Sequence, residues 1–337
     1  MLQRLYRQWK PWLNYCLLFL VTASLAIGCT AQQPTAESNK TITVGISPWP
    51  GYSAQYVATA KDLFKAQGIT VKEVAFASQS DSDTAFLAGK VDVNWTGLPN
   101  AVPQFSRDPS IQVIFQCDYS NGSDGILGRG IKTAADIKGK KVARENVLFE
   151  ELLLRRYLSN MGLKREDVTT VDLSAADSAA AFTAGKVDIA VTYEPWMTKA
   201  AKEGKGEIVF TTKGTNIIPD GVTARKEFVE KNKDTVVAYL KALDQAVKLI
   251  QADPSAVAEP IAKSLGITPA EVPEQVGGVK LYTLQDNKTI TFNRADPMNL
   301  FDSLDFASKT AAEIKLIPSP VDINTVMNDT VVQAAAP

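Results

Sequence analysis

The chain has 337 residues, of which 45% are hydrophobic and 22% are charged, and its formal net charge is −1. This composition excludes an intrinsically disordered protein and leaves room for two modest hydrophobic cores. Residues 1–28 hold three basic residues and no acidic one, so the remainder has 33 basic and 37 acidic residues. Because this remainder is mildly acidic and has no basic block, we expect no nucleic-acid partner.

The first 28 residues have the pattern of an export signal. A basic stretch, "MLQRLYRQWK", precedes the apolar run "LNYCLLFLVTASLAIG", and Cys29 follows directly. This order resembles a bacterial lipoprotein signal with "AIGC" as its lipobox, although Ala26 stands where such signals usually carry leucine. An uncleaved membrane anchor is the alternative. Either one predicts a body tethered outside the cytoplasmic membrane, with residues 29–40 as a polar tether.

From Thr41 onward the pattern alternates between strands and helices. The β-rich segment "TITVGIS" leads into the loop "PWPGY", and apolar residues at helical spacing follow up to Gly68. Further strands and helices alternate up to "DYSNGSDG", where the same order restarts. The alternation predicts an α/β fold with two lobes, each built on a mostly parallel sheet flanked by helices. Helical patterns fill the C-terminal part, and the terminal "VVQAAAP" is expected to fray.

Two octapeptides are almost identical: "AFLAGKVD" at residues 85–92 and "AFTAGKVD" at residues 181–188. The match extends in register, 96 positions apart, to three further pairs, namely Asp81 and Asp177, Thr96 and Thr192, and Pro99 and Pro195. We expect each copy to be a helix that Asp81 or Asp177 caps at its start and that Gly89 or Gly185 ends, followed by a buried strand. Ligands of open α/β sheets bind beyond the carboxyl ends of the strands. The repeat therefore predicts a cleft shared by two lobes.

The two copies differ directly after the shared threonine. Where the first continues "TGLPN", the second continues "TYEPW". Gly97 thus corresponds to Tyr193, Leu98 to Glu194, and Asn100 to Trp196. We interpret the shared positions as structural and expect the unshared ones to carry specificity.

Five segments in this order, "SPWPGYSAQYVATAKDLF", "AFLAGKVDVNWTGLPNAV", "DYSNGSDGI", "DIKGKKVA" and "AFTAGKVDIAVTYEPW", resemble the substrate-binding lipoproteins of ABC importers in the nitrate, taurine and aliphatic-sulfonate group. That group also includes proteins similar to thiamine-pyrimidine binders. The resemblance implies the two-lobed type II fold of periplasmic binding proteins, with the ligand cleft between the lobes. It implies that residues 41–121 form the first part of lobe 1, that residues 122–220 form lobe 2, and that residues 221–337 return to lobe 1.

The implied partners are a small-molecule solute, an ABC permease and, through the permease, the ATPase subunit. We expect a monomer held by a lipid on Cys29 at the periplasmic side of the bacterial cytoplasmic membrane, with no cofactor. The chain has 0 His, neither a nucleophile elbow nor a P-loop, and in Cys117 a single body cysteine with no evident base. We therefore predict a protein that is not an enzyme. A carboxylate-based enzyme and a membrane-tethered sensor are the alternatives.

The candidate ligand-binding residues are aromatic, acidic and small polar side chains of the first loop, the repeats and the crossover: Trp49, Tyr52, Ser78, Thr96, Asp118, Asn121, Asp124, Glu145, Glu194 and Trp196. In an extended crossover Asp118 and Asp124 share one side, although they could instead serve hinge amides, and Glu145 could instead face a helix start. Carboxylates beside aromatic rings suit a cation. We expect a cationic or zwitterionic solute such as guanidinium, a thiamine-pyrimidine-like base or taurine; an aliphatic sulfonate or nitrate is the alternative.

Overall fold

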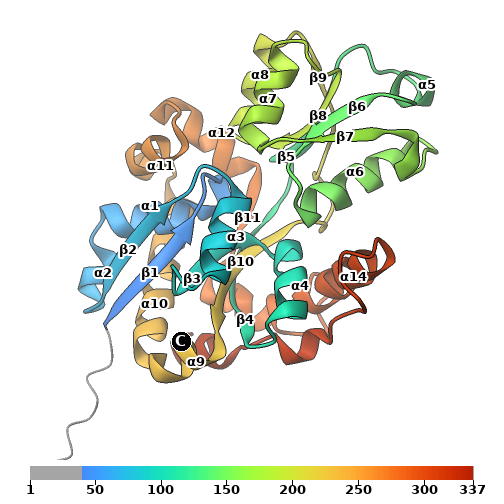
Figure 1. Cartoon of the computed structure of the whole chain (residues 1–337). Coiled ribbons are helices and arrows are strands. Elements are labelled where there is room, and N and C mark those ends of the chain that lie inside the picture. Colours follow the sequence, from blue (N-terminus) through green and yellow to red (C-terminus); the bar gives the residue numbers. More distant parts are fainter. Residues whose placement is uncertain (1–39, 337) are drawn as a thin grey trace, which may run out of the picture. The chain divides into compact units, whose positions relative to one another are not determined.

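Two β-sheets organise the part of the chain that the computed structural model describes, residues 40–336 (Figure 1). The first sheet has the strand order β11-β4-β10-β3-β1-β2 and the second the order β7-β6-β8-β5-β9. The strands of the first sheet are β1 Thr41–Ile46, β2 Thr70–Ala75, β3 Val93–Gly97, β4 Ile111–Ser120, β10 Pro219–Arg225 and β11 Val279–Leu281. Those of the second are β5 Asp124–Gly128, β6 Lys141–Arg144, β7 Thr169–Asp172, β8 Ile189–Tyr193 and β9 Glu207–Thr211. The predicted signal and Cys29 lie outside the described residues.

Fifteen α-helical segments of the described residues surround these sheets. Those up to the second crossover are α1 Ser53–Ala60, α2 Leu63–Ala66, α3 Gln79–Leu87, α4 Leu98–Arg107, α5 Ala134–Ile137, α6 Leu148–Asn160, α7 Ala175–Thr183 and α8 Trp196–Glu203. The later ones are α9 Lys226–Lys231, α10 Lys233–Ala252, α11 Ala258–Leu265, α12 Val272–Gly277, α13 Leu284–Asp286, α14 Leu300–Glu313 and α15 Thr330–Ala335. The terminal segment does not fray as expected, because Val331 and Val332 of α15 are buried and α15 packs on α10.

The predicted two-sheet α/β architecture is confirmed, but the sheets are mixed rather than mostly parallel. In the first sheet β1 pairs in parallel with β2 and β3, whereas β10 is antiparallel to β3 and β4. In the second sheet β6 is parallel to β7 and β8, whereas β5 is antiparallel to β8 and β9. The antiparallel strands β5 and β10 are the segments by which the chain enters the second sheet and returns to the first. A chain that arrives from the other sheet needs no helical crossover, so it can run antiparallel.

The repeated octapeptides form the same helix-to-strand unit in both sheets, α3 to β3 and α7 to β8. The predicted caps at Asp81 and Asp177 are wrong, since Ser78 and Ser174 precede the helices and their hydroxyl oxygens accept the amides of those aspartates. The glycines behave as predicted. Gly89 has φ = 69° and Gly185 has φ = 72°, a conformation that glycine adopts at little cost.

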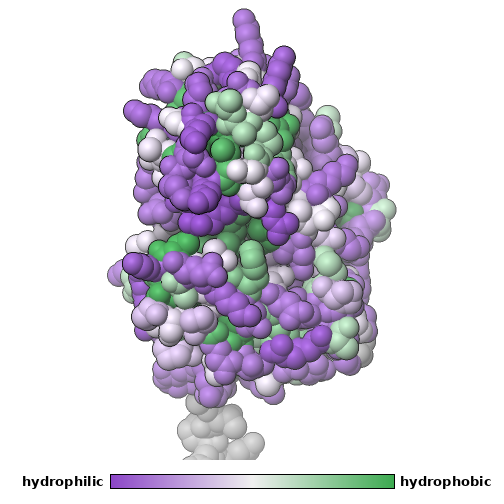
Figure 2. All heavy atoms as spheres, turned by 90° about the vertical axis from the view of Figure 1, so that its right-hand side faces the viewer, coloured by the Kyte–Doolittle hydropathy of each residue, from purple (hydrophilic) through white to green (hydrophobic). Residues whose placement is uncertain are grey.

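The largest apolar core lies around the first sheet and continues into the C-terminal helices. At its centre Trp95 of β3 donates from Nε1 to the hydroxyl of Tyr239, 2.8 Å away, which ties β3 to α10. Two smaller cores lie in the second sheet, one including Leu154 of α6 and the other Phe182 of α7. Figure 2 shows a face dominated by hydrophilic residues, with hydrophobic residues in small separate groups. No helix among residues 40–336 is long and apolar enough to cross a membrane.

Candidate functional site

The crossover strands bring two equivalent aspartates to the ends of two equivalent strands. Asp124 and Asp220 are each followed by glycine, and they are 96 positions apart, the same offset as the repeat. In the antiparallel register Asp124 lies opposite Tyr193 of β8, and Asp220 lies opposite Gly97 of β3. The repeat therefore includes the crossovers, and it aligns one carboxylate of each sheet with the same strand end.

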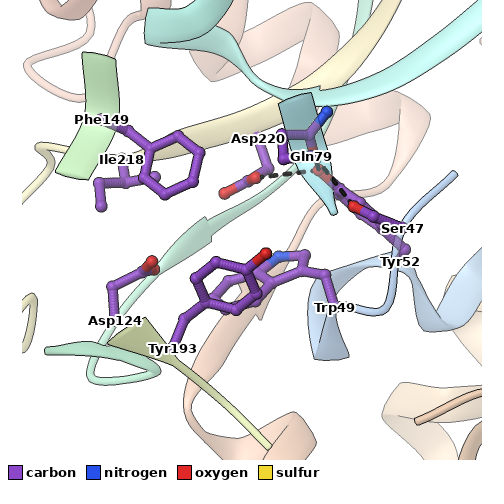
Figure 3. Close-up of a pocket in the computed structure, with 9 residues that line it drawn as sticks. All are labelled: Ser47, Trp49, Tyr52, Gln79, Asp124, Phe149, Tyr193, Ile218 and Asp220. Carbon is purple, nitrogen blue, oxygen red and sulfur yellow. Dashed lines mark hydrogen bonds between the residues drawn. The ribbon is translucent and has the colours of Figure 1, made fainter. Parts of the chain in front are cut away.

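A small cavity lies between these strand ends (Figure 3). Its volume is about 10 Å³, which is near the space that one water molecule needs. Residues of both sheets line it: Ser47, Trp49, Tyr52, Gln79, Asp124, Phe149, Tyr193, Ile218 and Asp220. A solute of several atoms fits only if these walls move apart.

Both aspartates direct an unsatisfied oxygen toward this space. The Oδ2 atoms of Asp124 and Asp220 are buried and have no hydrogen-bond partner among the described residues. Tyr52 donates its hydroxyl to Asp220 Oδ1 at 3.3 Å, which leaves the second oxygen free. Figure 3 shows the two carboxylates on different sides of the cavity, and none of the nine described residues that line it is cationic. Buried acceptors of this kind need a donor, since an unsatisfied buried oxygen costs about 1 to 3 kcal/mol.

Burial changes the proton affinity of both groups. It raises the pKa of Asp124 to about 7, with the Glu194 carboxylate adding to the rise and a hydrogen bond from Ser120 opposing it. The pKa of Asp220 is raised well above its ordinary value, mainly by burial and then by the charges of Asp118 and Asp124. A cation between the two aspartates would favour their ionised forms and offset these shifts.

Aromatic rings form the walls around the carboxylates. The rings of Trp49 and Tyr193 meet edge to face with centroids 5.7 Å apart, and Phe149 lies 6.1 Å from Tyr193. Ser47 donates to Oε1 of Gln79 at 3.1 Å, and the hydroxyl oxygen of Tyr52 lies 3.4 Å from the same atom. The cavity thus combines flat π-faces with oxygen acceptors, a combination suited to a flat group that carries N–H donors.

Three of the sequence-predicted site residues line the cavity, namely Trp49, Tyr52 and Asp124. Asp118 lies next to them behind the indole, with both carboxylate oxygens 3.4 Å from Trp49 Nε1. Burial raises its pKa to about 7, while the bonds from Cys117 and Trp49 oppose the rise. Asp118 therefore supports the Trp49 wall.

The other predicted residues do not line the cavity, and their part in binding stays a prediction. Ser78 caps α3, and the buried hydroxyl of Thr96 lies 3.3 Å from the carbonyl of Gly97. Asn121 accepts the amide of Gly214 at 3.1 Å, at the base of the crossovers.

Glu194 accepts the amide and the hydroxyl of Thr198, so it serves the start of α8 rather than the cavity. Trp196 is half-buried beside Tyr193, with ring centroids 5.1 Å apart, and lines an outer groove. Glu145 accepts from Ser80 at the start of α3, whereas its alternative interpretation pointed to the helix that follows it, α6, whose first amides Asn100 accepts.

Six lining residues were missed: Ser47, Gln79, Phe149, Tyr193, Ile218 and Asp220. Asp220 had a signal in the sequence, because its Asp-Gly pair stands at the 96-residue offset from Asp124. Tyr193 had one as well, as an aromatic residue where its counterpart is Gly97. Phe149 and Ile218 carried none, since apolar residues at such spacing also suit a core.

The described residues offer little to a metal or a nucleophile. No group of three or more His, Cys, Asp or Glu among them could hold a metal ion. Cys117 is buried within residues 40–336 as a free thiol, and burial raises its pKa well above the ordinary value. A thiol held protonated in this way is a poor nucleophile.

Comparisons with known proteins agree with this architecture. The sequence model of the family described as NMT1/THI5 like matches residues 49–257. A protein of Bacillus subtilis (strain 168), provisionally named an aliphatic sulfonates-binding protein, is 26% identical over 239 residues, covering 68% of this chain and 72% of that protein.

Three solved structures have the same fold. The alkanesulfonate-binding protein SsuA from Xanthomonas axonopodis pv. citri, bound to MOPS, matches with a TM-score of 0.74 at 18% identity, over 88% of this chain and 100% of that one. The periplasmic nitrate-binding protein NrtA from Synechocystis PCC 6803 matches with 0.70 at 14% identity, over 88% of each chain. The desulfurization enzyme DSZB matches with 0.64 at 17% identity, over 88% of this chain and 98% of that one.

Proposed function

The chain belongs to the NMT1/THI5-like family, and from this premise we propose that it is the solute-binding component of an ABC importer. The solute enters between the two sheets, where the strand ends of both meet at the cavity. The names of the SsuA and NrtA structures support a binding role, because both are binding proteins with this fold. The permease and its ATPase subunit are the partners that this role requires.

The solute class follows from the pair Asp124 and Asp220, the observation that carries the proposal. Each has a buried, unsatisfied Oδ2, they approach from different sheets, and the lining residues supply no cation. A cationic or zwitterionic compound with N–H donors on two edges satisfies both oxygens at once, and the rings of Trp49 and Tyr193 attract positive charge. Guanidinium, an amine-bearing pyrimidine like that of thiamine, and taurine are the candidates.

An aliphatic sulfonate or nitrate is the second candidate. The Bacillus subtilis relative and the SsuA and NrtA structures are named for such anions. A sulfonate group needs donors, and in this cavity it would meet the unsatisfied oxygens of Asp124 and Asp220 unless both were protonated. Ionised aspartates would repel the anion whereas protonated ones would donate to it, so we place a simple anion second for pH values above the Asp124 pKa of about 7.

An enzymatic role has less support. DSZB is an enzyme with this fold. In this chain, however, histidine is absent and burial raises the pKa of the described cysteine, so neither supplies the usual base or thiolate nucleophile. A purified protein that leaves every bound candidate chemically unchanged fits the binding role, and turnover of any of them would contradict it.

The place in the cell depends on Cys29. A lipid on this cysteine would hold the binding protein at the periplasmic side of the membrane, where residues 30–40 act as the tether. Replacing Cys29 with alanine should then abolish a lipid-modified mass, and a variant that keeps this mass would refute the lipobox.

The test is isothermal titration of the purified protein with guanidinium chloride at millimolar concentration, an aminopyrimidine, taurine, methanesulfonate and nitrate, with thermal shifts in parallel. Binding to the folded state raises the melting temperature by mass action. We expect guanidinium or the aminopyrimidine to bind most tightly. Preferential binding of methanesulfonate or nitrate would reject the cationic class and support the second candidate.

A further inference from the structure

A single buried carboxylate meets the starts of both repeated helices. Glu145 directly follows β6 of the second sheet, and its Oε1 accepts the amide of Ser80 at 2.9 Å and the Ser80 hydroxyl at 2.5 Å. Ser80 is the second residue of α3 in the first sheet. Burial raises the pKa of Glu145, and the backbone amide of Ala175, the first residue of α7, lies near enough to the carboxylate to oppose that rise. Glu145 therefore joins two helix starts that the repeat made equivalent.

The strand register places Glu145 at the ligand-facing edge of its sheet. Val44 of β1 pairs with Val93, and Val142 of β6 pairs with Ile189, the position 96 residues after Val93. Ser47, which lines the cavity, follows Val44 by three residues, and Glu145 follows Val142 by three residues. The two are thus equivalent positions.

Glu145 is also incompletely satisfied. Glu145 is only 2% exposed, and its Oε2 has no hydrogen-bond partner among the described residues. The nearest base, Arg144, pairs with Glu151 at 3.2 Å and donates to the backbone carbonyl of Glu145.

Two more acids lie near this carboxylate. Asp83 of α3 and Glu150 of α6 both interact with Glu145 through charge, and burial raises the pKa of each, which reduces their negative charge. Helix starts carry unsatisfied N–H groups and a positive partial charge, so an anion is the natural occupant of the point where α3 and α7 meet.

We propose that the helix starts of α3 and α7 form an anion-binding site that Glu145 fills from within the chain, and that Glu145 thereby excludes the sulfonate, carboxylate or nitrate group of a solute. Gln79, the residue before Ser80, lines the cavity, so the filled site adjoins the solute's place. The inference rests on the proposed function, because exclusion matters only where a solute enters the same cavity. It makes Glu145 a specificity-determining residue rather than a contact of a cationic ligand.

The test uses the variants Glu145→Ala and Glu145→Gln of the full-length protein, with sodium formate and methanesulfonate as probes. Removing the side chain in Glu145→Ala leaves the Ser80 and Ala175 donors open. We expect formate, which fits the vacated carboxylate position, to bind this variant at least about tenfold more tightly than the wild type. Formate should also reverse part of the decrease in melting temperature that the substitution causes. Glu145→Gln keeps the shape and removes the charge, so it should fold normally and gain methanesulfonate affinity by about threefold.

Each outcome decides one question. If the anion affinities stay at the wild-type value in both variants, the role of Glu145 is overturned. If only Glu145→Gln folds, an unchanged affinity in that variant is enough to overturn it. A titration with guanidinium separates this from the proposed function. Guanidinium binding by the wild type with no anion gain in either variant rejects only the Glu145 inference. Anion gain without guanidinium binding in any form retains the inference and rejects the cationic solute.

Discussion

The two repeated segments, residues 78–100 and 174–196, have the same frame but different faces toward the cavity. Ser78 and Ser174 cap equivalent helices in the same way. After the shared threonine the copies differ, because Gly97 leaves room for the ring of Phe149 from α6, whereas Tyr193 contributes a ring of its own. Shared residues thus build the lobes, and unshared residues shape the space between them. The equivalent carboxylates Asp124 and Asp220 then face each other across an asymmetric aromatic wall.

The largest effect is expected where the equivalent carboxylates act on a ligand. Asp124→Asn and Asp220→Asn should each weaken guanidinium binding by about 10- to 150-fold, the loss of a charge-assisted hydrogen bond worth roughly 1.5 to 3 kcal/mol. Without ligand both variants should be at least as stable as the wild type, because each removes a buried carboxyl group whose ionisation costs free energy. Isothermal titration measures the affinity, and thermal melting measures the stability.

Glu194→Gln is the matched control. Glu194 is also a carboxylate and lies near Asp124, but its oxygens serve Thr198 of α8, so the variant should keep guanidinium affinity within about threefold. A loss as large as that of Asp124→Asn would show that the carboxylates act through their summed charge and not through contact.

A second effect should follow the protonation of Asp124. Its pKa of about 7 in the folded protein lies above its ordinary value of 3.8, so between these values the native state binds more protons than the unfolded chain. Its stabilising contribution is complete below about pH 4, and is lost as the pH rises through 7. Guanidinium affinity should change in the opposite direction, increasing roughly tenfold from pH 5.5 to 8 as the carboxylate ionises.

The pH series is checked by melting and titration at each pH, with Asp124→Asn alongside. The variant should show a flatter dependence of both quantities. An unchanged slope in the variant would assign the titration to Asp118 or Asp220 instead.

A third effect concerns the asymmetric position of the repeat. A Cβ at Gly97 would lie 2.7 Å from Cδ1 of Phe149, so Gly97→Ala forces this ring of α6 to move. We expect about a fivefold loss of ligand affinity, near the lower end of the roughly 1 to 3 kcal/mol typical of overpacking. Gly277→Ala is the control, since nothing lies within 4 Å of its added Cβ. Equal ligand affinities in the two variants would show that Gly97 has no part in closing the protein around the ligand.

The sequence predicted the frame better than the cavity, for physical reasons. The alternation of elements and the "AGK" turns are local signals, and they located the repeat in both sheets. The direction of β5 and β10 depends on which sheet the chain comes from, so the antiparallel pairing of these interior strands was missed. The cap positions were misplaced by three residues, because serine and aspartate both suit a helix start and only the backbone geometry distinguishes Ser78 from Asp81.

For the site, residues in loops and crossovers were easier to find than residues on helices. Trp49, Tyr52 and Asp124 stand out as aromatic or acidic residues beside turn-forming ones, and all three line the cavity. Glu194 also stands out, yet it caps a helix, since the sequence does not tell which way a carboxylate beside a helix start points. Phe149 reaches the cavity only because two sheets approach each other, which no local pattern encodes.

The smallest effects test whether the two copies of the frame are energetically equivalent. Ser78 accepts the amide of Asp81 at 3.2 Å, and Ser174 accepts that of Asp177 at 3.1 Å. Replacing either serine by alanine removes one acceptor at a helix start and should lower the free energy of unfolding by about 1 kcal/mol, measured by urea denaturation. Asp81→Ala is the control, since this residue, which the sequence suggested as the cap, does not provide the capping oxygen, so the variant should lose less than Ser78→Ala. Because each serine caps the helix that leads into the repeated octapeptide, the two losses should agree within about 0.5 kcal/mol. A much larger loss for Ser78→Ala would mean that its helix start, which also binds Glu145 through Ser80, is stabilised by the contact between the sheets as well as by its own cap.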